Sequence, residues 1–198
     1  MAWPAVKKPV LAKDFEASLE TVAGMTWRPQ FIVLHNTSIP TLKQRPDGFL
    51  KTHVEALESY YKNDRGWSGG PHYFIDDHCI WVFNPLTHPG VHSPSWNKVA
   101  IGIEMLGEYN VEPFTSGRGN LVRRNAVVAI AALSRKLGFK SDAWKFHMDD
   151  PKTDHDCPGT MARKDRANLV RDIQVEMNGL TTKPWQFPAT DTSFKKIG

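Results

Sequence analysis

The amino-acid sequence predicts one α/β domain with a central mixed β-sheet flanked by helices. Short apolar runs alternate along the chain with longer stretches of helical periodicity, which is the pattern of an α/β fold. Of the 198 residues, 40% are hydrophobic and 23% are charged, so the chain can bury a substantial core. We expect residues 29–178 to form the domain, between an N-terminal extension (1–28) and an extended or partly disordered tail (179–198).

The N-terminal part is expected to be mostly irregular and to lead into a buried strand. Residues 1–28 show little periodicity, apart from a possible short helix at Lys13–Val22. Phe31–Leu34 is a continuous apolar run, which is typical of a central strand covered on both faces. This predicted strand ends at His35, and the residues that follow it, 36–40, have the composition of a loop.

An amphipathic helix is predicted for Asp47–Asn63. Its apolar side chains recur at steps of four, three and four residues, which is helical spacing. Asp47 is the expected N-cap because its carboxylate can accept from free backbone N–H groups. The glycine-rich segment Gly66–Pro71 ends the helix. The apolar positions are Leu50, Val54, Leu57 and Tyr61.

Three further strands are predicted in the middle of the chain. His72–Ile75 and Ile80–Phe83 flank the turn Asp76–Asp77, so we expect them to pair as a hairpin. Val99–Met105 is another apolar run, and it carries a single carboxylate, Glu104. A buried carboxylate is costly unless it is paired or functional, which makes Glu104 a candidate general base. A solvent-facing residue near a strand end is the alternative.

The C-terminal part is predicted to be mainly helical. Tyr109–Asn120 has the composition of a polar loop, and Leu121–Leu137 is a strong helical pattern closed by Gly138. Trp144–Asp156 is dense in His and Asp and is expected to be a loop. A last helix is predicted for Thr160–Met177.

Composition restricts the functional classes. The formal net charge is +4, from 25 Lys and Arg against 21 Asp and Glu, which favours polyanions such as nucleic acid, anionic lipid or an anionic cell wall. We do not expect nucleic-acid binding, because there is no dense basic cluster. Membrane insertion is not expected either, since no 18-residue run is apolar. Residues 1–14 lack the apolar core of a signal peptide, so we expect synthesis in the cytoplasm and, by default, a monomer.

Two stretches of the sequence have metal-ligand character. His35 ends a rigid strand, and His147 and Cys157 lie ten residues apart in a loop bounded by Pro and Gly. Two imidazoles and one thiolate leave the fourth tetrahedral position open, as a catalytic zinc requires. Each stretch also has an ordinary explanation, namely a hydrogen-bonded strand-end histidine and a polar surface loop. Cys157 could instead be a nucleophile, although a zinc-bound thiolate is poorly suited to that.

Four segments together resemble a known family. FIVLHNTS, GPHYFIDDHCIWVF, NKVAIGIEMLGEY and HMDDPKTDHDCPGT are similar, in that order, to the type-2 N-acetylmuramoyl-L-alanine amidases. That family includes amidase-type phage endolysins, anhydro-muramyl amidases and peptidoglycan recognition proteins. The resemblance extends from about Phe31 to Arg171. It implies an amidase or peptidoglycan-recognition type of domain with one zinc ion, held by His35, His147 and Cys157.

The resemblance also implies roles for other residues. Glu104 matches the catalytic Glu of cytosolic bacterial members. His155 stands where many members have a Lys that is thought to stabilise the oxyanion, so here an imidazole would have to do so. His72 stands where some phage members have a catalytic Tyr and others a His. The expected substrate contacts, each with a purely structural alternative, are His92, Asn97, Trp67 and Trp96.

The implied activity is hydrolysis of the bond between N-acetylmuramic acid and L-alanine in peptidoglycan. A phage or prophage endolysin that reaches the wall through a holin is the favoured role. The alternatives are a cytosolic amidase that recycles soluble anhydro-muropeptides and a non-catalytic peptidoglycan-binding protein. Members of the last kind commonly lose the third zinc ligand, whereas Cys157 is present here. A helix with the His-Glu-x-x-His motif of many metallopeptidases does not occur.

Overall fold

The computed structural model describes residues 5–19, 25 and 27–179. Their centre is a six-stranded sheet in the order β1-β4-β3-β5-β2-β6. The last four strands of this order run parallel, whereas β4 is antiparallel to both of its neighbours. The predicted mixed sheet of a single α/β domain is confirmed. The strands are β1 (Lys8–Val10), β2 (Phe31–Asn36), β3 (Tyr73–Ile75), β4 (Ile80–Val82), β5 (Ala100–Met105) and β6 (Trp144–Phe146).

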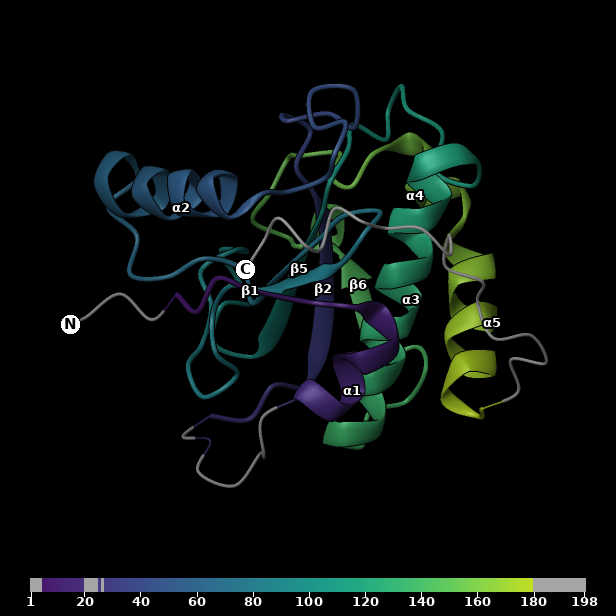
Figure 1. The fold of residues 1–198 in the computed structure, drawn as a ribbon. Helices are drawn as coiled ribbons and strands as arrows, with labels where there is room; N and C mark the ends of the chain where they lie inside the picture. Colours follow the sequence, from purple (N-terminus) through teal and green to yellow (C-terminus); the bar gives the residue numbers. More distant parts are fainter. Residues whose placement is uncertain (1–4, 20–24, 26, 180–198) are drawn as a thin grey trace.

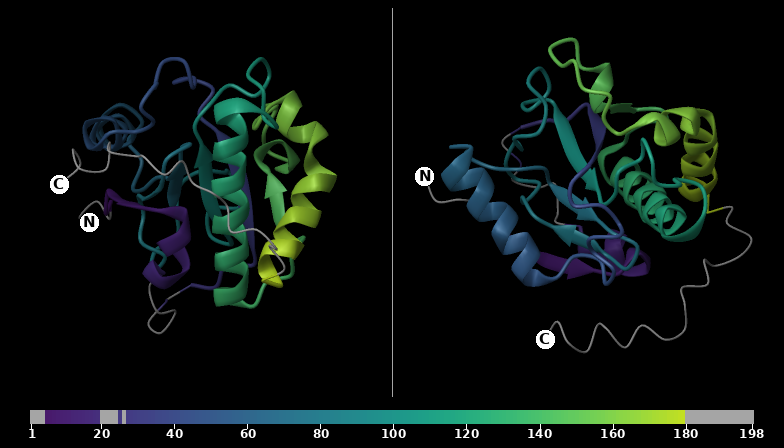
Figure 2. Two further views of the ribbon diagram at one scale, coloured as in Figure 1. Left: turned by 45° about the vertical axis from the view of Figure 1, so that its right-hand side comes forward. Right: turned by 90° about the horizontal axis from the view of Figure 1, so that it is seen from above.

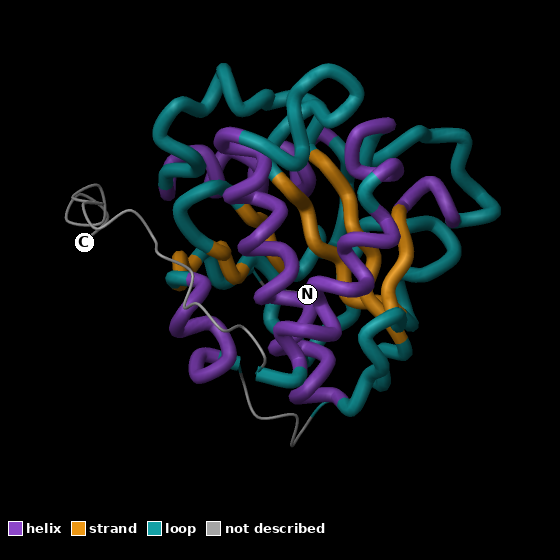
Figure 3. Tube along the Cα trace, turned by 90° about the vertical axis from the view of Figure 1, so that its right-hand side faces the viewer, coloured by secondary structure: helices purple, strands orange, loops and turns teal. Residues whose placement is uncertain are grey.

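Helices cover both sides of this sheet. The long helix α3 packs against α1 and α5 on one side, and α2 lies on the other (Figures 1 and 2). The long loops gather at one end of the strands, at the top of Figure 3. None of the helices in the described part of the chain could span a lipid bilayer. The helices are α1 (Phe15–Ser18), α2 (Lys51–Ser59), α3 (Gly117–Leu137), α4 (Thr160–Lys164) and α5 (Arg166–Met177).

The central strands lie where the sequence predicted buried strands. Ile32, Val33 and Leu34 of β2 are fully buried, because the helices cover the sheet on both sides. The hairpin of β3 and β4 and the buried strand β5 are likewise confirmed. Gly138 ends α3 in a left-handed conformation with φ of 72°, as its place after the apolar pattern predicted.

The start of α3 lies four residues before the predicted one, at Gly117 instead of Leu121. The first turn contains Gly119, which has low helix propensity and therefore concealed the helix in the sequence. A Cβ atom on Gly119 would lie 1.9 Å from the carbonyl oxygen of Pro113. The close approach of the preceding loop thus requires glycine inside this helix.

Two further sequence predictions are wrong. The sequence predicts a loop for Trp144–Asp156, but Trp144–Phe146 form the strand β6 beside β2. A three-residue strand is too short to show periodicity, and β6 forms because an edge of β2 is free to pair with it. Asp47 is not the N-cap of α2, since this helix starts at Lys51 after Leu50.

The predicted C-terminal helix is divided in two at Asp165. The backbone of this residue leaves helical geometry, with φ of −90° and ψ of 2°. Its carboxylate accepts hydrogen bonds from Arg123 of α3 and from the side chain of Asn168. A contact with another helix therefore fixes the break, and no pattern within the segment itself could have predicted it.

The N-terminal segment contributes to the sheet, contrary to the expected lack of structure. β1 pairs with β4, and Phe15 of α1 is fully buried against Tyr73. The predicted helix at Lys13–Val22 corresponds to helical residues 12–18, and its last three residues lie outside the described part of the chain. The predicted tail from 180 onward also lies outside it.

Candidate metal centre

The parallel pairing of β2 with β5 places His35 directly beside Glu104. Both side chains line a cavity of about 320 Å³. The loops that follow the strands close this cavity, together with the segment between β6 and α4. Its lining residues are His35, Asn36, Ser38, Tyr61, Trp67, Pro71, Val91, His92, Glu104, Glu108, Asn110, His147, His155, Asp156 and Cys157.

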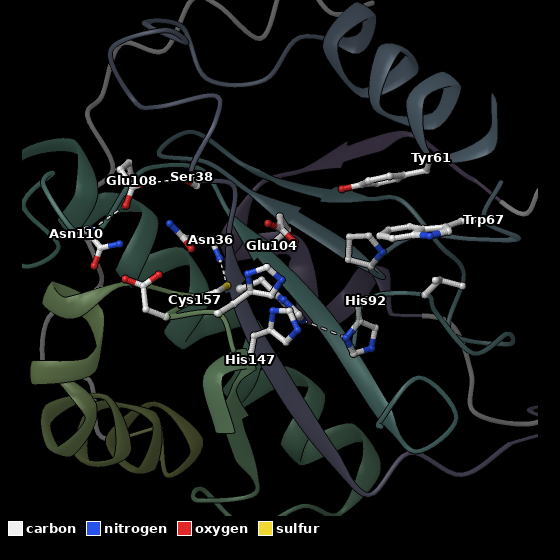
Figure 4. Close-up of a pocket in the computed structure, with 15 residues that line it drawn as sticks. Asn36, Ser38, Tyr61, Trp67, His92, Glu104, Glu108, Asn110, His147 and Cys157 are labelled. Carbon is white, nitrogen blue, oxygen red and sulfur yellow. Dashed lines mark hydrogen bonds between the residues drawn. The ribbon is translucent and has the colours of Figure 1, made fainter. Parts of the chain in front are cut away.

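His35, His147 and Cys157 converge in this cavity, as the sequence predicted for metal ligands. One ligand atom from each residue lies within 4.8 Å of the other two. Zinc bonds of about 2.0–2.3 Å would place such atoms roughly 3.4–3.8 Å apart in a tetrahedron, so small inward movements would complete the site. Figure 4 shows His147 and Cys157 side by side below Glu104.

The surroundings of the three side chains fit a metal ion. The Nε2 atom of His147 is buried and has no hydrogen-bond partner among the described residues. Such an atom is costly unless it binds something. The sulfur of Cys157 accepts a hydrogen bond from the backbone N–H of Asn36 at 3.3 Å, which favours the thiolate. A borderline-soft cation such as Zn²⁺ suits this set of two nitrogens and one sulfur.

The protonation states of the ligands also fit. Burial, followed by the nearby His92 and His147, keeps the pKa of His35 well below its ordinary value, so its imidazole is neutral. Burial, with the nearby Glu104, raises the pKa of Cys157 well above its ordinary value. A metal ion must therefore displace a proton from Cys157 when it binds.

Asp150 ties the loop of His147 to the neighbouring loop at Ser93. Its buried carboxylate accepts hydrogen bonds from the Ser93 hydroxyl and from the backbone N–H of Ser95, the latter at 3.0 Å. Burial alone would raise the pKa of Asp150, but these hydrogen bonds outweigh it and lower the pKa. The carboxylate is therefore ionised at neutral pH and holds the two loops together.

Glu104 is placed as a general base would be. Burial raises the pKa of its carboxyl group to about 8. Its side chain makes no hydrogen bond with the described residues, which leaves its oxygens available to a water molecule in the cavity. A carboxylate with a raised pKa accepts a proton more readily than an ordinary one.

His155 lines the outer part of the same cavity. Its side chain is exposed, and its ring centre lies 5.6 Å from that of His147. Its backbone N–H donates to the Thr153 hydroxyl, and its ring makes no hydrogen bond with the residues that the structure describes. Its imidazole can therefore turn towards a ligand near the metal ligands.

His72 lies behind the cavity and does not line it. Both ring nitrogens have partners, since Nε2 donates to the His88 carbonyl and Nδ1 accepts from the Gly102 N–H, each at 3.1 Å. The ring also stacks on Trp27, with ring centres 5.4 Å apart. Burial lowers the pKa of His72 to about 3. In this arrangement His72 supports the sheet and has no free atom for acid or base chemistry.

The predicted substrate contacts divide into two groups. Trp67 lines the cavity and stacks on Tyr61 with ring centres 5.0 Å apart, and His92 lines it beside His35. Asn97 and Trp96 do not line it. The Asn97 side-chain oxygen accepts from the backbone N–H groups of His92 and Ser93. Trp96 packs edge-on against Phe31 of β2.

Several residues that line the cavity are not predicted from the sequence. Helical spacing places Tyr61 on the apolar face of a helix, but α2 continues as a π turn (Tyr60–Asp64), and the Tyr61 ring lines the cavity. Figure 4 shows its hydroxyl directed inwards near Glu104. Burial and the charge of Glu104 raise the pKa of Tyr61. Asn36, the last residue of β2, was also not expected to line the cavity. The remaining lining residues that the sequence does not predict lie in loops whose composition carries no signal: Ser38, Pro71, Val91, Glu108, Asn110 and Asp156.

Comparison with known proteins gives a consistent result. The family model described as N-acetylmuramoyl-L-alanine amidase matches residues 25–160. Among curated proteins, peptidoglycan-recognition protein SC2 of Drosophila melanogaster is 28% identical over 69 residues, 34% of this chain and 38% of that protein. The match thus spans well under half the length of that relative.

Solved structures have the same fold. The endolysin N-acetylmuramoyl-L-alanine amidase LysCS from Clostridium intestinale is 22% identical, with a TM-score of 0.56 over 85% of this chain and 91% of that one. A mutant of Drosophila PGRP-LB, solved in complex with tracheal cytotoxin, is 17% identical, with a TM-score of 0.57 over 82% and 89% of the two chains.

Proposed function

Because the chain belongs to the type-2 N-acetylmuramoyl-L-alanine amidase family, we propose that it is a zinc-dependent amidase that cleaves the bond between N-acetylmuramic acid and L-alanine in peptidoglycan. The observation that carries this proposal is the convergence of His35, His147 and Cys157 beside Glu104 in one cavity. Residues 29–178 form the catalytic domain in this proposal.

The three ligands would hold one zinc ion with a fourth position open towards the cavity. A zinc ion bound there supplies Lewis-acid chemistry, which polarises an amide carbonyl and promotes the ionisation of water. Positive charge at this site would also favour the ionised form of Glu104 at neutral pH.

Glu104 performs the proton transfers in this proposal. Its carboxylate removes a proton from the attacking water, whose oxygen adds to the amide carbon. When the carbon–nitrogen bond breaks, Glu104 returns the proton to the departing L-alanine nitrogen. His155 also lines the cavity, and an N–H group of its imidazole would stabilise the developing oxyanion.

In this proposal the same cavity also binds the substrate. Trp67, stacked on Tyr61, offers an aromatic surface at its edge. Aromatic faces of this kind pack well against sugar rings and other apolar groups. In contrast, Asn97 and Trp96 lie away from the cavity, so their contribution to binding would be indirect.

We favour lysis of the cell wall as the biological role. The protein would be an endolysin made in the cytoplasm and released to the wall through a holin, and it would act as a monomer. The net charge of +4 would assist adsorption to an anionic envelope. Recycling of soluble anhydro-muropeptides in the cytoplasm uses the same chemistry and is the alternative role.

Digestion of purified peptidoglycan tests both the reaction and the role. We expect new L-alanine amines without new reducing sugars, as identified by mass spectrometry of the products. New reducing ends would contradict the proposed bond. Intact sacculi and soluble anhydro-muropeptide are offered side by side, and activity confined to the soluble substrate would exclude the endolysin role.

A further inference from the structure

A chain of hydrogen bonds reaches from the backbone of β5 to the metal centre. The Nε2 atom of His92 lies 3.1 Å from the carbonyl oxygen of Ala100. Its other ring nitrogen, Nδ1, lies 3.1 Å from the Nε2 atom of His35. The second contact is drawn as a dashed line in Figure 4.

The direction of these hydrogen bonds follows from their chemistry. A carbonyl oxygen only accepts, so Nε2 of His92 must carry a hydrogen atom. In a neutral imidazole the other nitrogen is then an acceptor, and His35 must donate to it from Nε2. This leaves Nδ1 of His35 without a hydrogen atom and free to bind a cation.

The fold holds the His92 ring in this place. A Cβ atom on Gly102 would lie 2.5 Å from Cγ of His92, so the ring lies against β5 where only glycine leaves enough room. The Asn97 side-chain oxygen accepts from the backbone N–H of His92 at 2.7 Å. Ring and backbone are thus fixed independently.

We propose that His92 is a positioning residue, which holds His35 in the tautomer that presents Nδ1 to the metal ion. This inference rests on the proposed zinc site. It differs from the expected contact with substrate, because both ring nitrogens of His92 are already engaged within the protein. Partners behind metal-bound histidines generally fix the orientation and tautomer of the ring.

Two substitutions separate this role from simple packing. His92→Leu keeps the bulk of the side chain but removes the acceptor. His92→Asn keeps an oxygen close to the former position of Nδ1 and can still accept from His35. His88→Leu is the matched control, because its ring is exposed and lies outside the cavity lining.

Zinc affinity is measured for each folded variant by competition with a chromophoric chelator. We expect His92→Leu to bind zinc roughly 10–100-fold more weakly than the unsubstituted protein. His92→Asn should recover much of this loss, and His88→Leu should bind normally. An unchanged affinity of His92→Leu, or equal losses in both His92 variants, would overturn the proposal.

Nitrogen-15 NMR of the zinc-free protein gives a second readout, which remains valid if His92→Leu does not fold. We expect His35 to be the Nε2–H tautomer, and an Nδ1–H tautomer would refute the proposal. Failure of the unsubstituted protein to bind zinc or to release L-alanine amines would count against the proposed function, whereas the tautomer of His35 is decided separately.

Discussion

The two walls of the cavity are built in different ways. His35 and Glu104 stand side by side on β2 and β5, where the ladder of the sheet fixes their backbone. His147, His155 and Cys157 lie on the segment between β6 and α4, which is mostly irregular. The first wall will be called the strand wall and the second the loop wall.

Individual hydrogen bonds hold the loop wall in its conformation. Asp150 joins it to the turn at Ser93, and the Met148 N–H donates to the Cys157 carbonyl at 2.9 Å. The sulfur of Cys157 in turn accepts from the Asn36 N–H at the end of β2. The candidate metal ligands therefore come from two kinds of structure, a strand fixed by the sheet and a loop held by individual hydrogen bonds.

The largest effect is expected from the loop wall ligand Cys157. Cys157→Ser should abolish hydrolysis and lower zinc occupancy, because a hydroxyl is a much weaker zinc ligand than a thiolate. Metal analysis and peptidoglycan digestion measure the two effects. Cys79→Ser removes a buried thiol away from the cavity and is the control. Full activity with unchanged zinc in Cys157→Ser would refute the assignment.

On the strand wall, Glu104→Gln should separate chemistry from metal binding. We expect zinc to be retained while turnover falls by roughly 10²–10⁴-fold, the usual contribution of a general acid–base. Glu108→Gln is the control, since this carboxylate lines the same cavity but accepts from Ser38 and Asn110. Near-normal turnover of Glu104→Gln would remove this residue from the mechanism.

The hydrogen bonds between the loop wall and the turn at Ser93 are tested at Asp150. Asp150→Ala leaves the Ser93 hydroxyl and the Ser95 N–H without their acceptor, which should lower the free energy of unfolding by about 1–3 kcal/mol. Zinc affinity should fall as well. Chemical denaturation measures the first effect, with exposed Asp154→Ala on the same loop as control. Equal stability of the two variants would show that the loop wall needs no such tie.

The last effect is small at neutral pH and grows as the pH falls, and it concerns His72, which accepts from the Gly102 N–H of β5. The folded protein lowers the pKa of His72 from 6.5 to about 3, whereas the unfolded chain takes up this proton near pH 6.5. Stability should therefore fall as the pH decreases between these values, by up to about 1.4 kcal/mol per pH unit from this group.

His72→Asn should reduce this dependence on pH. The variant keeps an acceptor for the Gly102 N–H but has no group that titrates in this range. We expect it to be less stable at neutral pH and to show a shallower slope in denaturation measured from pH 7 to pH 4. Parallel slopes for the two proteins would mean that His72 is protonated in the folded state as well.

The strand wall and the three candidate metal ligands could be predicted from the amino-acid sequence. A continuous apolar run ending at His35 predicts a buried central strand, and so does the run around Glu104. His147 and Cys157 could be selected because few residue types bind zinc and their loop is bounded by Pro and Gly. Each of these signals alone also has an ordinary explanation, so the order of the segments along the chain carries the prediction.

The contacts between these segments become visible in the three-dimensional structure alone. Trp144–Phe146 form a strand because they pair with the edge of β2. The C-terminal helix is interrupted at Asp165, whose carboxylate accepts from Arg123. A π turn after α2 places Tyr61 at the cavity. His72 does not line the cavity, because both of its ring nitrogens make hydrogen bonds with backbone groups of His88 and Gly102. Each of these outcomes depends on a polar or packing partner distant in sequence, and local periodicity carries no information about such partners.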